Sequence, residues 1–276
     1  MQNFKTVVLL AAISGLLLLV GYGVGGLGGL IVALVVALLV NVSSYWFSAD
    51  IVLKTSGAQE IGYEDDPDLF RMIEQVANGA GLPMPRVYIM DSPQPNAFAT
   101  GRSPKHAAVA VTTGIRRLLT DRELRGVIGH EIAHVANRDI LTSSVVATVA
   151  SAISFLSFFA LWVGGGRRDG GGWLALLAAL LAPIAASLIQ LAISRSREYQ
   201  ADTDGANYVG DPIALASALA KLEQGAQLMP REVSESTAHL YIVNPLGGNS
   251  VSGLFSTHPP MEQRIERLRR MAGYPQ

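Results

Sequence analysis

Residues 120–137 read TDRELRGVIGHEIAHVAN, and this stretch decides how the rest of the chain is interpreted. The opening TDRE has the spacing of a capping box, in which a threonine and a glutamate satisfy free backbone amides at the start of a helix. His130 and His134 lie four residues apart on one face of that helix, so both imidazoles can reach one metal ion. Glu131 lies one residue further round, where it can face a metal-bound water without binding the metal.

A catalytic zinc site uses three protein ligands and leaves one position open for water. The chain has no cysteine, so the ligands must be histidine nitrogens or carboxylate oxygens. The pattern with a further histidine six residues after His134 fails, because that position is Ile140. We predict Glu198 as the third ligand, and Asp202, one helical turn later, as the acceptor that fixes the tautomer of a ligating imidazole. The remaining candidates are other carboxylates and the histidines His106, His239 and His258.

A solvated surface helix is the alternative for Glu198 and Asp202, and clusters of charge more commonly have that role. The zinc site is favoured because both motifs lie next to apolar segments. If residues 142–193 form an antiparallel membrane hairpin, the helices that carry His134 and Glu198 meet at its base. At about 1.5 Å per helical residue, both side chains then lie within roughly 12 Å of the membrane boundary. Cleavage is therefore expected close to the bilayer surface.

The distribution of charge indicates a membrane protein. Charged residues make up 16% of the chain, against about a quarter in soluble domains. Four apolar segments, at residues 6–24, 27–47, 142–163 and 173–193, approach the roughly 20 residues that cross a bilayer. A signal peptide is the alternative for the first segment, but a second apolar segment follows it at once. With 21 basic and 22 acidic residues, the chain lacks the basic excess of a nucleic-acid-binding protein.

Basic residues near the ends of membrane segments indicate orientation. Lys5 and Lys54 flank the first pair of segments, and two arginines follow the second pair. We therefore expect the N-terminus, residues 50–143 and the C-terminal tail on the cytoplasmic side. Arg167 and the arginine after it argue against this for the second pair, because they lie in the loop that this arrangement places outside.

Between the two apolar pairs the composition is that of a soluble domain. Apolar residues at helical spacing predict a helix over residues 67–79. Short runs rich in valine, isoleucine and alanine predict strands over residues 85–90 and 107–113. The expected fold is mainly α with a small β-sheet, fused to four transmembrane helices.

Taken together, these motifs resemble those of the HtpX-type membrane metalloproteases. They form part of the gluzincin family, which also includes the zinc-dependent CAAX prenyl endopeptidases. The resemblance covers nearly the whole chain. Its elements are the N-terminal apolar hairpin, the HEIAH of residues 130–134, the second hairpin, the Glu-x-x-x-Asp of Glu198 and Asp202, the NAFATG of residues 96–101, and the STHPP of residues 256–260 with Arg264 after it.

This resemblance implies a zinc metalloendopeptidase with a zincin-like α+β catalytic domain, in the inner membrane of a prokaryote. The catalytic domain would face the cytoplasm, with one Zn²⁺ per chain. Its partners would be the lipid bilayer and, in membrane protein quality control and stress response, unfolded and membrane-protein substrates. The same resemblance implies two further sets of site residues. An edge strand that would bind peptide substrate is formed by Asn96, Ala97, Phe98 and Ala99. His258 would donate a hydrogen bond to the oxyanion. By composition alone an ordinary loop and a surface histidine are more common.

The expected organisation has four parts. Residues 1–49 form a transmembrane hairpin and residues 50–141 the first part of the catalytic domain. Residues 142–194 form the second hairpin and residues 195–276 the second part of the catalytic domain. Two other functions stay open. One is a CAAX-type processing protease, which usually has more membrane helices. The other is an inactive scaffold that binds misfolded membrane segments, which needs none of the proposed zinc ligands.

Overall fold

The computed structural model describes residues 2–141, 145, 195–228, 242 and 259–274. The two apolar segments predicted between residues 142 and 193 lie outside the described residues, and so do His239 and His258. Their predicted roles therefore stay predictions.

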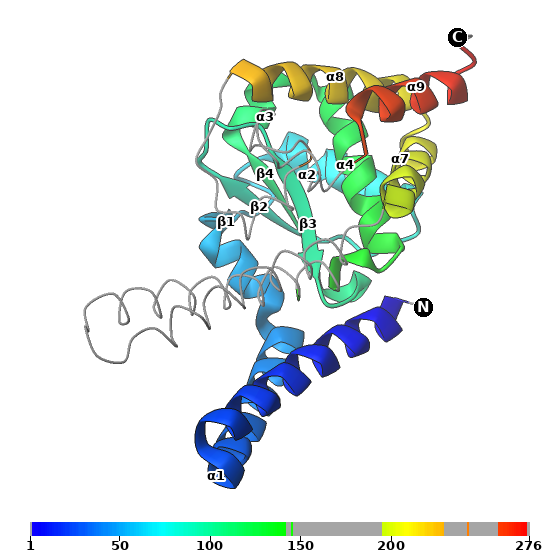
Figure 1. The fold of residues 1–276 in the computed structure, drawn as a ribbon. Helices are drawn as coiled ribbons and strands as arrows, with labels where there is room; N and C mark the ends of the chain where they lie inside the picture. Colours follow the sequence, from blue (N-terminus) through cyan, green and yellow to red (C-terminus); the bar gives the residue numbers. More distant parts are fainter. Residues whose placement is uncertain (1, 142–144, 146–194, 229–241, 243–258, 275–276) are drawn as a thin grey trace.

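The N-terminal helix α1 (Gln2–Thr55) folds back on itself (Figure 1). Gly26 has a φ of 57°, in the left-handed region that glycine adopts without steric cost. The Asn41 amide donates a 2.9 Å hydrogen bond to Ser14 Oγ, which holds the two arms together. Within the described residues one window, Gly26–Ser43, is long and apolar enough to cross a membrane, with a mean hydropathy of 2.4. Of the two membrane segments expected before residue 50, the described residues thus give one candidate span, and the other two expected segments lie outside them.

A four-stranded mixed sheet lies beyond the end of α1. Its strands are β1 (Ala58–Glu60), β2 (Arg86–Met90), β3 (Ala97–Gly101) and β4 (Ala107–Thr112), in the order β1-β2-β4-β3. The central pair β2 and β4 is parallel, and both outer pairs are antiparallel. The strands predicted at residues 85–90 and 107–113 are β2 and β4. β3 forms one edge of the sheet, and no other strand among the described residues pairs with its outer side.

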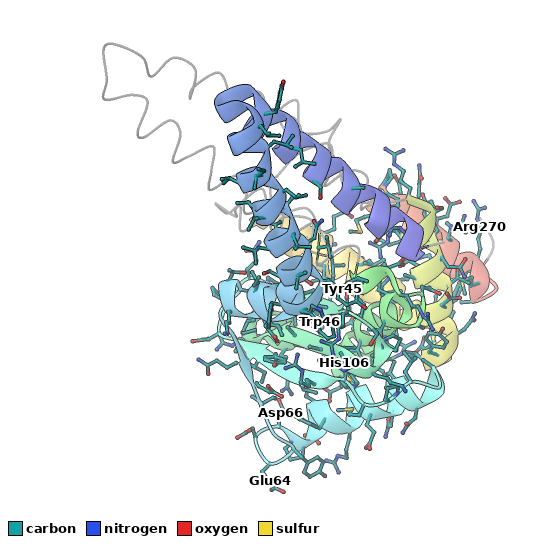
Figure 2. The ribbon with its side chains drawn as sticks, turned by 90° about the horizontal axis from the view of Figure 1, so that it is seen from below. Tyr45, Trp46, Glu64, Asp66, His106 and Arg270 are labelled. Carbon is teal, nitrogen blue, oxygen red and sulfur yellow. The ribbon has the colours of Figure 1, made fainter. Side chains whose placement is uncertain are left out.

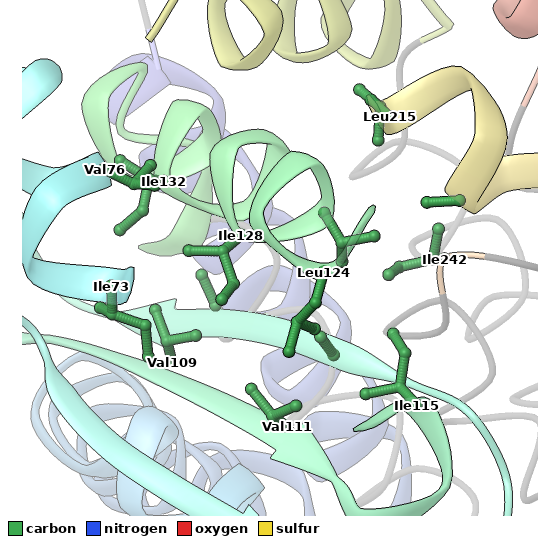
Figure 3. Packing of buried hydrophobic residues seen from close by; sticks show 14 of the residues in the cluster. Ile73, Val76, Val109, Val111, Ile115, Leu124, Ile128, Ile132, Leu215 and Ile242 are labelled. Carbon is green, nitrogen blue, oxygen red and sulfur yellow. The ribbon is translucent and has the colours of Figure 1, made fainter. Parts of the chain in front are cut away.

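Both faces of the sheet are covered, which explains the composition of β4. Ala108 and Ala110 face a small cluster that contains Val52 and Leu53 from the end of α1. The alternate valines of β4 face a larger cluster built with α2 (Pro67–Gly79) and α4 (Asp121–Ala136). Figure 3 shows two of these valines below Ile128 and Leu124 of α4. A strand buried on both sides carries apolar residues continuously rather than in alternation.

The remaining helices are α3 (Thr113–Leu118), α7 (Arg195–Val209), α8 (Pro212–Leu228) and α9 (Met261–Met271), with a 3₁₀ turn η1 (Pro104–His106) before β4. α4 is central, because it packs against the sheet, α2, α7 and α8. The predicted capping box is present at its start, where Thr120 and Glu123 bond each other's backbone amides. Lys221 of α8 donates a 2.7 Å hydrogen bond to the same Glu123 carboxylate, which ties α8 to the first turn of α4.

The contact between α4 and α7 is unusually close, because glycines meet there. A Cβ atom on Gly205 of α7 would lie 2.6 Å from the backbone of Gly129 and of His130. Carbon atoms in contact are normally about 3.5–4.0 Å apart. Only glycine therefore allows the two backbones to approach this closely.

Candidate metal centre

The close contact of α4 and α7 brings three donor side chains together. His130 and His134 lie on α4, and Glu198 lies on the face of α7 that also carries Gly205 two turns later. The two Nε2 atoms are 3.2 Å apart. A Glu198 oxygen lies 3.7 Å from Nε2 of His130, and the other lies 3.5 Å from Nε2 of His134. All three side chains offer an electron pair to the same point in space.

This spacing fits a small divalent metal. Nitrogen and oxygen ligands at 2.0–2.2 Å from a tetrahedral zinc lie roughly 3.3–3.6 Å from one another. The three observed separations fall on or next to that range. Two histidines and one carboxylate, without cysteine, are also the donor set of a catalytic rather than a structural zinc site. The residues present therefore fit the metal.

A carboxylate lies next to Nδ1 of each of the two imidazoles. Asp202, the residue predicted for this role, has its Oδ1 3.0 Å from Nδ1 of His130. Asp139 Oδ2 lies 3.3 Å from Nδ1 of His134. Carboxylates in this position fix the tautomer so that Nε2 presents its lone pair to the metal. Asp139 was not predicted from the sequence. It follows the end of α4 at a turn where Arg138 has a φ of 59°.

Glu131 lies between this cluster and the edge of the sheet. It is 6% exposed, and its Oε2 accepts a 2.8 Å hydrogen bond from the backbone amide of Ala99. The backbone amide of Thr112 donates to the carbonyl of Asn96. Because backbone groups alternate in direction along an antiparallel strand, residues 96, 98 and 100 bond to β4, and the amides of residues 97 and 99 point away from it. The general base predicted from the sequence is thus in contact with the free side of β3.

A family model described as Peptidase family M48 matches residues 64–272 of this chain. The chain belongs to this family. Two curated relatives, each named Protease HtpX homolog, are 53% identical to it. The one from Syntrophobacter fumaroxidans aligns over 98% of this chain and 99% of its own length. The one from Persephonella marina aligns over 99% of this chain and 98% of its own length. The HtpX-type family and the metallopeptidase class predicted from the sequence are confirmed.

A solved structure shares the fold of this M48 peptidase. The crystal structure of Ste24p from S. mikatae matches it with a TM-score of 0.50 at 21% identity. The match covers 96% of this chain and 65% of that chain. The likeness supports the mainly helical architecture with a small sheet.

The peptidase has a buried arginine beside its metal centre that was noted in the sequence only as part of a motif. Arg264 of α9 is fully buried, and it donates two hydrogen bonds, of 2.7 and 2.8 Å, to the two oxygens of Asp202. Burial alone raises the pKa of Asp202, but the Arg264 charge and these hydrogen bonds hold it well below its usual range. Asp202 is therefore ionised behind His130, and α9 takes part in building the centre.

The other residues considered for the site differ in burial and in their distance from the metal centre. Asn96 is 3% exposed and Ala97 fully buried, at the start of β3. Phe98 packs on the far side of the sheet in the cluster with Val52 and Leu53, and its backbone groups point toward β4, so it is not placed to contact a peptide at the strand edge. His106 is exposed in η1, where its Nδ1 lies 3.0 Å from Ser103 Oγ and away from the metal centre.

We expect metal binding to release a proton from His134. Burial lowers the pKa of this imidazole, but the Asp139 hydrogen bond and the charges of Glu198 and Glu131 raise it to about 9. Without metal the ring therefore stays protonated at neutral pH, whereas a metal ligand must be neutral. Apparent zinc affinity should then rise about tenfold per pH unit until pH reaches the pKa of His134.

Calorimetric titration of the metal-free peptidase with zinc, in buffers of different ionisation enthalpy, counts this proton. Asp139→Asn replaces the charged acceptor that raises the pKa of His134 with a neutral one, and should reduce both the proton release at pH 7.5 and the pH dependence. Equal proton release by the variant and the wild type would show that Asp139 does not set the protonation of His134.

Glu198→Ala is expected to remove most of the zinc from the purified peptidase, because two imidazoles remain where three ligands are needed. Zinc content by plasma mass spectrometry after dialysis measures this directly. Glu223→Ala, which removes a carboxylate from α8, is the matched control and should keep one zinc per chain. Full zinc occupancy in Glu198→Ala would assign the third ligand to another residue.

Proposed function

We propose that this M48 peptidase is a membrane-embedded zinc endopeptidase that cuts misfolded or damaged membrane proteins near the cytoplasmic surface of the bilayer. One observation carries the proposal. The three donor side chains converge beside Glu131, and Glu131 itself contacts the free edge of β3. Metal ligands, general base and peptide-binding edge are thus adjacent.

His130, His134 and Glu198 would hold the zinc, which polarises the scissile carbonyl and lowers the pKa of its bound water. Glu131 is placed to take a proton from the attacking water and to deliver it to the leaving amine. An extended peptide would add as a further strand beside β3, bonding to the amide of Ala97 and the carbonyls of residues 97 and 99, since the amide of Ala99 already donates to Glu131. His258 is proposed, by the resemblance of its motif, as a donor to the developing oxyanion.

The substrate class follows from how the sheet is attached to α1. The candidate span ends at Ser43, and Val52, nine residues later on the same helix, packs against the sheet. Nine helical residues rise roughly 13 Å. The catalytic domain therefore begins directly at the membrane surface, where loops and unfolded ends of membrane proteins are within reach. Lys5 and Lys54 on the flanks of α1 favour the cytoplasmic side.

The test compares two substrates in proteoliposomes that contain the full-length peptidase, stripped of metal and reloaded with zinc. One substrate is casein in solution, and the other is a destabilised protein anchored by one transmembrane helix. We expect zinc-dependent cleavage of both, and faster cleavage of the anchored one. Cleavage of a single site in a lipidated C-terminal peptide, and of neither unfolded substrate, would favour the processing protease. Stoichiometric zinc with no cleavage of any substrate would favour the scaffold.

A further inference from the structure

A cavity lies where α1 meets the sheet, away from the metal centre. Its volume is about 310 Å³. One wall is the last part of α1, with Tyr45, Trp46 and Ser48, and the opposite wall is the start of β2 and the turn after β3, with Arg86, Arg102 and Lys105. In Figure 2 Tyr45 and Trp46 of α1 lie next to His106 of that turn. We call this cavity the junction pocket.

The charge of the junction pocket is strongly positive. Asp50 is the only acidic residue among those that line it. Arg86 is partly neutralised, because it pairs with Asp50 at 3.4 Å and with Glu60 at 3.9 Å. Within the described part of the chain, Arg102 and Lys105 form no ion pair with a carboxylate. Two positive charges therefore face the cavity without an internal counterion, which is the electrostatic signature of an anion site.

Two further contacts indicate a built site rather than a scatter of surface charges. The guanidinium of Arg102 stacks 4.4 Å from the centre of the Trp46 ring, an arrangement that holds a cation in place without neutralising it. Ser48 also lines the pocket, from a side chain that is 1% exposed, and its hydroxyl has no hydrogen-bond partner among the described residues. A buried hydroxyl without a partner is costly unless a ligand accepts its hydrogen bond.

The position of the junction pocket relative to the candidate membrane span indicates the chemical class of the anion. The candidate membrane span ends at Ser43, and the pocket begins two residues later at Tyr45. Tyr45 and Trp46 are 41% and 51% exposed, large aromatic side chains at the end of an apolar helix. Tyrosine and tryptophan gather at the level of lipid headgroups, where one end of the ring is apolar and the other is wet. The anions at that level are headgroup phosphates.

We propose that the junction pocket binds the phosphodiester of an anionic phospholipid from the cytoplasmic leaflet. The phosphate oxygens accept hydrogen bonds from Arg102 and Lys105, with Ser48 as a further donor. The glycerol and the first acyl carbons lie against Tyr45 and Trp46. A lipid bound there connects α1 with the turn that follows β3. The proposal rests on the insertion of α1 into the membrane, which forms part of the proposed function.

The experiment uses full-length peptidase in nanodiscs with equal amounts of phosphatidylglycerol and phosphatidylcholine. Lipid that stays bound after transfer to mild detergent and gel filtration is identified by native mass spectrometry. The wild type should retain phosphatidylglycerol in roughly 25-fold preference, which is the product of about fivefold for each of the two cations. The Arg102→Gln/Lys105→Gln double variant should lose this preference, since each cation near a membrane surface contributes roughly a fivefold gain in anionic lipid binding. Lys105→Gln alone, which keeps the contact between Arg102 and Trp46, should give an intermediate value.

The matched control is Arg117→Gln/Arg269→Gln, which removes two exposed positive charges elsewhere on the catalytic domain. Equal loss of phosphatidylglycerol in this control, or no preference in the wild type, would overturn the proposal. Displacement of the lipid by millimolar glycerol phosphate would mean that the pocket takes soluble phosphate esters, and would overturn the assignment to a lipid. Cleavage of casein in detergent and flotation of the chain with liposomes test the proposed function separately, so failure of the pocket alone leaves both unchanged.

Discussion

Glu131→Gln is expected to reduce proteolysis to background while one zinc stays bound per chain. The variant keeps all three donor side chains, and its amide oxygen can still accept the hydrogen bond from Ala99 that anchors Glu131 in the structure. It lacks only a group that takes a proton from water. A positioned general base contributes about 10²- to 10⁴-fold to the rate. Casein cleavage and zinc content, measured on the same preparation, report the two expectations together.

Glu74→Gln is a suitable control, because this exposed residue of α2 makes the same chemical change far from the metal centre. It should cleave casein at the wild-type rate. Near-normal cleavage by Glu131→Gln would assign the base to another residue. Loss of zinc from that variant would show instead that Glu131 helps to hold the metal.

Gly205→Ala is expected to separate α7 from α4 and thereby weaken zinc binding by more than tenfold. The added methyl group would lie 2.6 Å from backbone atoms of Gly129 and His130, which cannot rotate away as a side chain can. Overpacking of this kind costs about 1–3 kcal/mol. The effect on the metal is direct, because Glu198 belongs to the helix that must move and both histidines belong to the other.

Gly225→Ala on α8 provides the comparison, because its Cβ meets only the Leu118 side chain, at 3.3 Å. Alanine is a better helix former than glycine by up to roughly 1 kcal/mol, so this variant should be as stable as the wild type or slightly more stable. Competition with a chromophoric chelator gives the zinc affinity, and thermal unfolding gives the stability. Wild-type zinc affinity in Gly205→Ala would show that the helices tolerate separation.

The parts of the fold that could be predicted are those whose signals are local. The capping box and the histidine spacing are contained within a single helix, and the helix predicted over residues 67–79 coincides with α2. β1 was missed because it has three residues and is defined by its pairing with β2. Assignment of β3 depended on the family resemblance, since Ala97–Gly101 follows a stretch of turn-forming residues and shows no alternation of polar and apolar side chains.

The parts of the site that were missed depend on contacts between distant segments. Nothing near Gly205 in the sequence indicates that it touches Gly129. The partner of Arg264, Asp202, lies 62 residues earlier in the chain. Asp139 is close to His134 in sequence, but it reaches the imidazole only because the backbone reverses at Arg138. Each of these requires either the packing of two helices that are distant in the sequence or a turn that its residue types do not favour.

The position of Arg264, near the C-terminal end of the chain, has a consequence for biosynthesis. Domains form during translation in the order in which their segments leave the ribosome. α1 emerges first and can enter the bilayer while the rest of the chain is still being made. Asp202, the carboxylate next to His130, gains its partner Arg264 only when α9, the last described helix, has been synthesised and has docked. If α1 inserts into the bilayer as it is made, the chain is attached to the membrane before Asp202, beside His130, has its arginine partner.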